Sequence, residues 1–168
     1  MHLAEATLLD SLRVMHILAG ITWIGLLYYF NLAQAQAFAQ MDPAARTNAI
    51  TGLVPRVLFL FRWAAFFTVV FGIAYIGAAS SFIDGYWDSA RFYNIAIGGT
   101  MGIIMAANVW FIIWPNQKKI IAAAQSGGTP EPSWGRSATM ASRTNTMLSI
   151  PMLFFMVGAR NLPSLWGN

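Results

Sequence analysis

The stretch Val14-Met-His-Ile-Leu-Ala-Gly-Ile-Thr-Trp-Ile-Gly-Leu-Leu-Tyr-Tyr-Phe30 decides the class of fold. It is an apolar run of helix length, and a helix that crosses a membrane needs about 20 such residues. Comparable apolar stretches recur three more times along the chain. The sequence therefore predicts an all-α integral membrane protein, a bundle of four transmembrane helices, at about residues 10–30, 56–80, 92–114 and 143–161.

Composition supports this class and limits the chemistry. Of the 168 residues, 57% are hydrophobic and 10% are charged, whereas soluble domains carry about 25% charged residues. This indicates a single membrane domain over residues 1–168. The chain has no cysteine, which excludes disulfides, Cys-ligated zinc, iron–sulfur clusters and covalently attached c-type haem.

The distribution of basic residues predicts the orientation. Loops are expected at 31–55, with a short surface helix at 43–52 begun by Asp42 and Pro43, and at 115–142. The sides containing these loops carry seven basic residues and the other side three: Arg46, Arg56, Arg62, Lys118, Lys119, Arg136 and Arg143 against Arg13, Arg91 and Arg160. The positive-inside rule places both termini outside and both loops in the cytoplasm, so that in a bacterial inner membrane the termini would be periplasmic. We expect the basic residues to contact lipid headgroups, with no role in nucleic-acid binding.

Apart from tyrosines, His16 is the only acid or base in the expected hydrocarbon-embedded part of the chain. Ionisable groups in a bilayer are costly and often functional, and imidazole is a common ligand of haem and metals. His16, Gly20, Trp23 and Leu27 form one stripe on a helix. Gly20 either leaves room for a flat macrocycle or lets another helix approach, with His16 donating to a neighbouring carbonyl or hydroxyl.

Other polar and small residues allow similar alternatives. Asn108 is expected either to form a hydrogen bond with the fourth helix or to contact a ligand. Met101 and Met105 are candidate thioether ligands, although methionine more often fills membrane cores. Pro151 interrupts the fourth helix, where hydroxyls of Thr146 or Ser149 are expected to help satisfy the freed carbonyl of Met147. Two stripes of small residues predict close helix packing: Ala64, Thr68 and Gly72, then Gly98, Gly102 and Ala106.

Three segments, in order, resemble the membrane domain at the N-terminus of bacterial PuuD-type urate oxidases. The first is His16-Ile-Leu-Ala-Gly-Ile-Thr-Trp-Ile-Gly25. The second is Asn108-Val-Trp-Phe-Ile-Ile-Trp-Pro-Asn-Gln-Lys-Lys-Ile-Ile121. The third begins at Trp134-Gly-Arg136 and continues through Asn145-Thr146 to Leu148-Ser-Ile-Pro151.

The resemblance implies a redox-associated subunit of the inner membrane, with haem b on His16 and with other membrane subunits or a periplasmic cytochrome as partners. The chain departs from that family because it lacks Cys-x-x-Cys-His, is shorter, and carries Thr144 and Arg160 where histidines are expected. Two alternatives remain: a non-catalytic accessory subunit of a larger membrane complex, and a haem-associated porphyrin oxidase. The latter rests on the first helix, which also resembles four-helix membrane protoporphyrinogen oxidases.

Overall fold

The computed structural model describes residues 3–161 and, of these, the side chains through residue 159. The expected periplasmic tail and the Arg160 side chain lie outside the described residues. Within the described range the chain is all-helical. Its first helical rod comprises α1 (Leu3–Tyr28), the π-helical segment η1 (Tyr29–Gln34) and α2 (Ala35–Gln40). The second comprises α3 (Pro43–Asn48), η2 (Ala49–Leu53) and α4 (Val54–Phe82).

The second half of the chain contributes two more rods. A short 3₁₀ turn, η3 (Tyr86–Asp88), leads into α5 (Ala90–Asn108), η4 (Val109–Ile113) and α6 (Trp114–Gln125). The last helix is α7 (Pro132–Asn161). Rods 3–40, 43–82 and 90–125 are long and apolar enough to cross a membrane. The structure thus fits an all-α membrane protein, as the sequence predicted.

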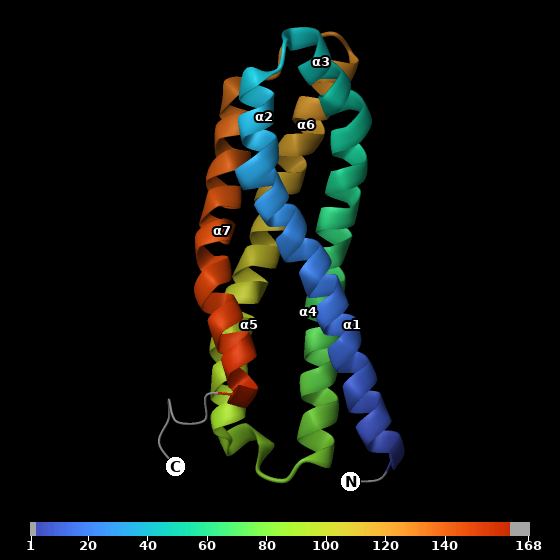
Figure 1. Cartoon of the computed structure of the whole chain (residues 1–168), viewed down its shortest axis with the longest axis vertical. Coiled ribbons are helices and arrows are strands. Elements are labelled where there is room, and N and C mark those ends of the chain that lie inside the picture. Colours follow the sequence, from blue (N-terminus) through green and yellow to red (C-terminus); the bar gives the residue numbers. More distant parts are fainter. Residues whose placement is uncertain (1–2, 162–168) are drawn as a thin grey trace.

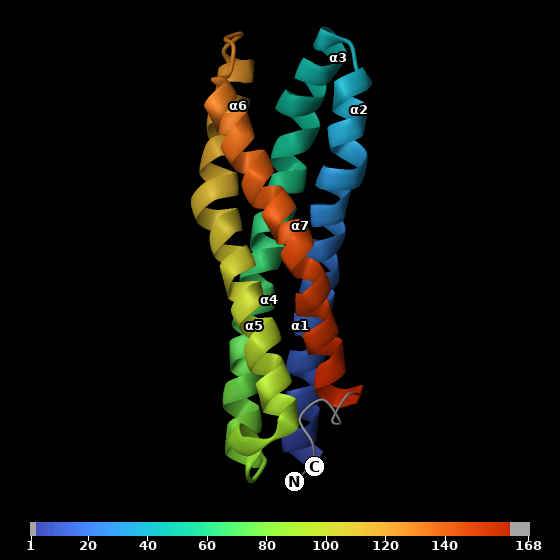
Figure 2. The same ribbon diagram turned by 90° about the vertical axis from the view of Figure 1, so that its left-hand side faces the viewer.

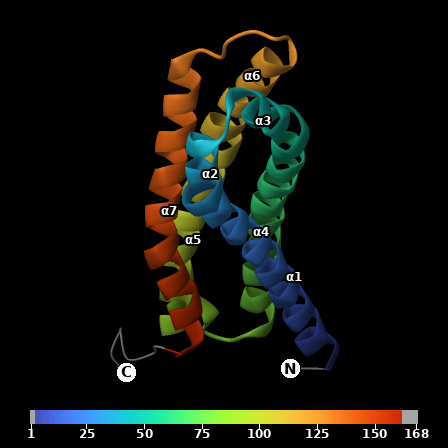
Figure 3. The same cartoon turned by 45° about the horizontal axis from the view of Figure 1, so that its top comes forward.

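The four rods form an elongated bundle (Figure 1). Helix α1 packs mainly along α4, and α5 packs along α7, as the turned view also shows (Figure 2). The 41–42 turn and the 126–131 loop lie at one end of the bundle, and the 83–89 loop lies at the other with both described chain ends (Figures 1 and 3). Gly85 and Gly127 adopt φ values of 67° and 72° in these loops, a region that glycine enters without strain.

The prediction of two long loops at 31–55 and 115–142 is wrong in extent. Both segments are largely helical, and only 41–42 and 126–131 interrupt them. Residues 31–40 and 116–125 are rich in alanine, glutamine and lysine, which favour helix without being apolar. A helix can therefore continue beyond the apolar run. The helix start at Pro43 is confirmed, and Asp42 caps it by accepting from the amides of Ala44 and Ala45 at 3.0 Å. The helix does not end near residue 52, however, because it continues through η2 into α4.

Two of the π-helical segments come directly before a proline. Segment η2 leads into Pro55, and η4 leads into Pro115. Proline has no amide hydrogen for the carbonyl four residues earlier, and its ring crowds that carbonyl. A wider π turn moves the carbonyl away while the rod continues. These prolines therefore explain how the second and third rods pass from one helix to the next without breaking.

Pro151 lies inside α7, as expected. The two hydroxyls near it, however, bond other carbonyls than the one expected. Thr146 Oγ1 donates to Ser142 O at 3.1 Å, and Ser149 Oγ donates to Thr146 O at 2.7 Å. The expectation that they bind the Met147 carbonyl is wrong, because each hydroxyl finds a carbonyl three or four residues earlier in its own helix.

Candidate functional site

His16 lies on the face of α1 that packs against α4. Its Nδ1 atom is 2.8 Å from the backbone carbonyl oxygen of Thr68. A carbonyl oxygen can only accept, so Nδ1 carries the proton and donates it. In the neutral ring the other nitrogen, Nε2, then keeps its lone pair. This is the tautomer that an imidazole needs in order to ligate a metal through Nε2.

The close approach of His16 depends on a glycine of α4. A Cβ atom at Gly72 would lie 3.0 Å from Nδ1 of His16 and 3.1 Å from Cε1. One turn away, Thr68 is buried, and its hydroxyl donates to the carbonyl of Ala64 at 2.7 Å. The predicted small-residue stripe of α4 therefore faces α1. It provides both the space and the acceptor for the imidazole.

The other members of the α1 stripe face the same way. The atom nearest to a Cβ at Gly20 would be Cγ2 of Thr68, at 3.8 Å. Trp23 and Leu27 are completely or almost completely buried in the main core. The space beside His16 at Gly20 is thus filled by α4, as the helix-packing alternative predicts.

Asn108 lies on a different pair of helices. Its Nδ2 donates to Oδ1 of Asn145 on α7 at 2.8 Å, and Nδ2 of Asn145 donates to the carbonyl of Met105 at 2.9 Å. Asn145 is fully buried. Asn108 therefore makes the bond to the fourth helix that the sequence allowed as one alternative, and the structure shows no contact that joins it to His16. Met105 is also fully buried in the core.

The prediction of close helix packing along the second small-residue stripe is only partly correct. A Cβ at Gly98 would lie 3.2 Å from the carbonyl oxygen of Met152 and 3.3 Å from the amide nitrogen of Met156. Nothing lies within 4 Å of a Cβ at Gly102. Helices α5 and α7 therefore touch closely at Gly98, whereas Gly102 faces open space.

A haem or metal bound at this position would have one protein ligand, His16. Among the described residues, no group of three or more His, Cys, Asp or Glu side chains could hold a metal ion. The donor chemistry fits a single axial ligand, because His16 has a fixed tautomer and a partly exposed ring. Gly20 and Trp23 do not form a slot for a macrocycle, because both are packed against neighbouring residues. The expected set of cofactor contacts thus reduces to His16 alone.

Arg62 lies among aromatic rings, which the sequence analysis did not predict. Its guanidinium carbon is 4.0 Å from the ring centre of Trp114 and between 5.7 and 5.9 Å from three others: Phe59, Trp63 and Trp110. Indole rings from two rods thus surround a cation. The sequence positions of Arg62, Trp110 and Trp114 do not indicate that they meet, because the two tryptophans belong to a different rod of the bundle from Arg62.

A second cluster of arginines lies at the end of the bundle that holds the 83–89 loop. Arg13 donates to the hydroxyl of Tyr75 at 3.0 Å, and Arg91 donates to the same hydroxyl. Arg13 also pairs with Asp10 at 3.1 Å. Tyr86, just outside the helices, is buried beside this cluster, and burial raises the pKa of its phenol. The nearby Tyr75 adds to that rise, and the Arg91 cation opposes it.

The profile of the family described as "Urate oxidase N-terminal" matches residues 69–167, more than half of the chain. The chain belongs to the urate oxidase N-terminal family. The matched region runs from within α4 through α7 and includes Asn108, whereas His16 and Arg62 precede it. No curated protein and no solved structure shows a significant match to the chain.

Proposed function

We propose that this protein is a membrane-embedded, redox-associated subunit of the urate-oxidase membrane-domain type, in which His16 would hold haem b. One observation carries the proposal: the 2.8 Å contact from His16 Nδ1 to the Thr68 carbonyl leaves Nε2 as a neutral donor atom inside a membrane bundle. A bound haem b would supply one-electron transfer. The protein's own part is to hold the tautomer and orientation of the imidazole.

The proposal includes the topology. Four rods cross the inner membrane, both termini are periplasmic, and the 41–42 turn and 126–131 loop are cytoplasmic. The family membership, the three long apolar helices and the excess of basic residues at the loop side support this arrangement. Helix α7 contributes the fourth crossing, because its 30 residues run the length of α5. A partner subunit or a periplasmic cytochrome would provide the second haem ligand and the electron path.

A non-catalytic accessory subunit is the second candidate. The His16–Thr68 bond and the fit of Gly72 against the ring favour it, because they explain a half-buried polar residue by helix packing alone. The two candidates differ in the need for Nε2. Only haem ligation requires its lone pair, whereas packing requires Nδ1.

Absorption spectra of the protein expressed with haem available, oxidised and reduced, separate these candidates. The proposal expects a Soret band in the wild type, its loss in His16→Ala, and its retention in His2→Ala, which changes the only other histidine. Free imidazole should restore part of the band to His16→Ala. A colourless wild type, or a band that survives His16→Ala, would refute haem ligation and leave the accessory role.

A further inference from the structure

The aromatic cage of Arg62 suggests a ligand site that is independent of His16. Arg62 lies six residues after the start of the expected second span near residue 56, about 9 Å along the helix at 1.5 Å per residue and at the loop-side end of that span. A charged side chain beside the hydrocarbon is costly unless it is paired. Within the described part of the chain, Arg62 has ring contacts but no acidic partner and no hydrogen bond.

Three hydrogen-bond donors around this cage are buried without an acceptor among the described residues. They are Nε of Arg62 and the indole Nε1 atoms of Trp63 and Trp110. The two indole rings are 5.6 Å apart and perpendicular. Leaving a buried donor unsatisfied is unfavourable, more so when the group is charged. These three atoms are covered by protein, so a ligand would meet the half-buried Arg62 through the rest of its guanidinium, whose positive charge matches an anion rich in oxygen acceptors.

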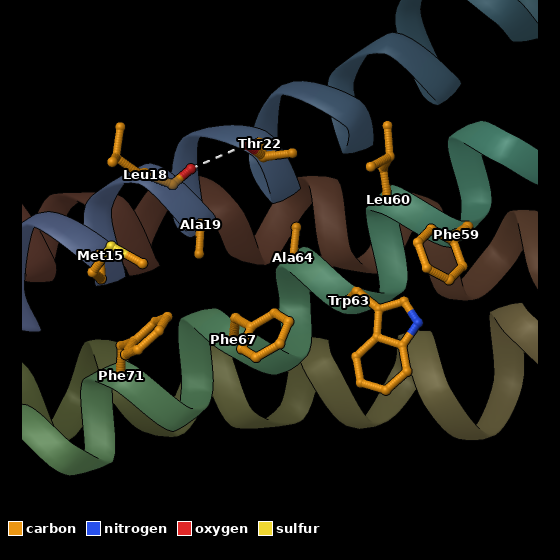
Figure 4. A pocket seen from close by; sticks show the side chains of 10 residues that line it. All are labelled: Met15, Leu18, Ala19, Thr22, Phe59, Leu60, Trp63, Ala64, Phe67 and Phe71. Carbon is orange, nitrogen blue, oxygen red and sulfur yellow. Dashed lines mark hydrogen bonds between the residues drawn. The ribbon is translucent and has the colours of Figure 1, made fainter.

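An apolar groove of about 690 Å³ runs along the surface between α1 and α4 and reaches this cage (Figure 4). Phe59 and Trp63 belong to both features. From there the groove extends past Ala64 and Phe67 to Phe71. The twelve steps from residue 59 to residue 71 span about 18 Å of helix, close to the roughly 15 Å thickness of one leaflet's hydrocarbon.

We infer that the groove and the cage together bind one anionic glycerophospholipid of the cytoplasmic leaflet. One acyl chain lies in the groove between α1 and α4, and the phosphodiester accepts hydrogen bonds from Arg62. An anionic headgroup fits better than a zwitterionic one, because the aromatic faces that would hold a headgroup ammonium already hold the guanidinium. Phosphate also suits the planar fork of arginine.

The test measures the unfolding midpoint of the detergent-purified protein during titration with dioleoyl-phosphatidylglycerol. Dioleoyl-phosphatidylcholine, dioleoylglycerol and inorganic phosphate are titrated in parallel. The wild type should be stabilised by phosphatidylglycerol and much less by the other three. A shift with inorganic phosphate equal to that with phosphatidylglycerol would overturn the lipid as the source of the anion. An equal shift with dioleoylglycerol or phosphatidylcholine would overturn the role of the anionic headgroup.

Variants assign the effect to the two parts of the site. Arg62→Gln should weaken phosphatidylglycerol binding about tenfold or more, as expected for loss of a charge-assisted hydrogen bond. Arg56→Gln removes the same charge from an exposed position of the same helix and should leave binding unchanged. Ala19→Phe fills the groove away from Arg62 and should also weaken binding about tenfold. If Arg62→Gln and Arg56→Gln bind phosphatidylglycerol equally well, the headgroup site is refuted. If Ala19→Phe binds it as well as the wild type does, the placement of the acyl chain in the groove is refuted.

Discussion

Gly72 faces His16 so closely that a Cβ atom on it would lie 3.0 Å from Nδ1 of the imidazole. The same nitrogen donates to the Thr68 carbonyl one turn earlier on α4. The glycine and the hydrogen bond therefore act together. The first lets the ring reach the helix backbone, and the second satisfies a polar group that would be costly to leave unpaired in lipid.

The Gly72→Ala variant should lower the stability of the protein. The added methyl group must push the imidazole away and so disturb its bond to Thr68, at a cost of about 1–3 kcal/mol. Thermal unfolding in detergent, followed by circular dichroism, measures the change. Gly77→Ala is the control on the same helix, because nothing lies within 4 Å of a Cβ there. Equal unfolding midpoints for the two variants would contradict this role of Gly72.

A second pair of glycines tests where α5 meets α7. Gly98→Ala should destabilise the protein by about 1–3 kcal/mol, because its methyl group would press on backbone atoms of Met152 and Met156 that have little freedom to move. Gly102→Ala should be neutral or stabilising by up to about 1 kcal/mol, since alanine favours helix and has open space there. Unfolding in a denaturing detergent, at matched lipid content, compares them. The reverse order of stability would show that the helices touch at Gly102 instead.

The sequence predicted the side of α1 that faces a neighbouring helix, because periodicity alone orients a stripe such as His16, Gly20 and Trp23. It did not predict which glycine of a stripe lies against the neighbouring helix. Gly98 and Gly102 look alike in the sequence, and only the path of α7 distinguishes them. Helix ends were misplaced for a similar reason, because hydropathy marks the membrane while alanine and glutamine continue the helix beyond it.

Arg62 shows the other limit of sequence reasoning. It was counted only as one basic residue among seven at the loop side. Its environment depends on Trp110 and Trp114, about fifty residues away in the sequence. A charge count records no such contact. The bond from His16 to Thr68 was anticipated only as a class of partner, since any carbonyl of a packed helix would have met the same need.

Asn145 should be the most sensitive polar residue of the α5–α7 contact. Replacing it by leucine removes both of its bonds and leaves the amide of Asn108 without its partner. The expected loss is about 1–2 kcal/mol, and the double change with Asn108→Leu should recover part of it in a double-mutant cycle. Asn116→Leu is the control, because that amide bonds a carbonyl of its own helical rod. Additive effects of Asn108→Leu and Asn145→Leu would contradict the coupling.

Tyr86 should make stability depend on pH in the alkaline range. Burial and the neighbouring Tyr75 raise the pKa of this phenol, so the folded state favours the neutral form. The resulting stability is complete below the ordinary tyrosine pKa of about 10 and is lost as pH rises through the folded value. Tyr86→Phe should weaken this dependence. At neutral pH it should cost little, because the hydroxyl has no hydrogen-bond partner among the described residues. Parallel alkaline dependence in both proteins would contradict the assignment.

The proposed orientation makes a prediction for the two ends of the bundle. Thr129 lies in the 126–131 loop and Asp84 in the 83–89 loop, and both residues are exposed. The protein has no cysteine of its own, so Thr129→Cys and Asp84→Cys each introduce a single label site. With the loop side cytoplasmic, a membrane-impermeant thiol reagent added to intact cells with a permeable outer membrane should label position 84 and not position 129. Disrupting the inner membrane should make both react, which controls for accessibility. Labelling of position 129 with protection of position 84 would reverse the topology. It would also move Arg62, and the lipid proposed to bind it, to the periplasmic leaflet.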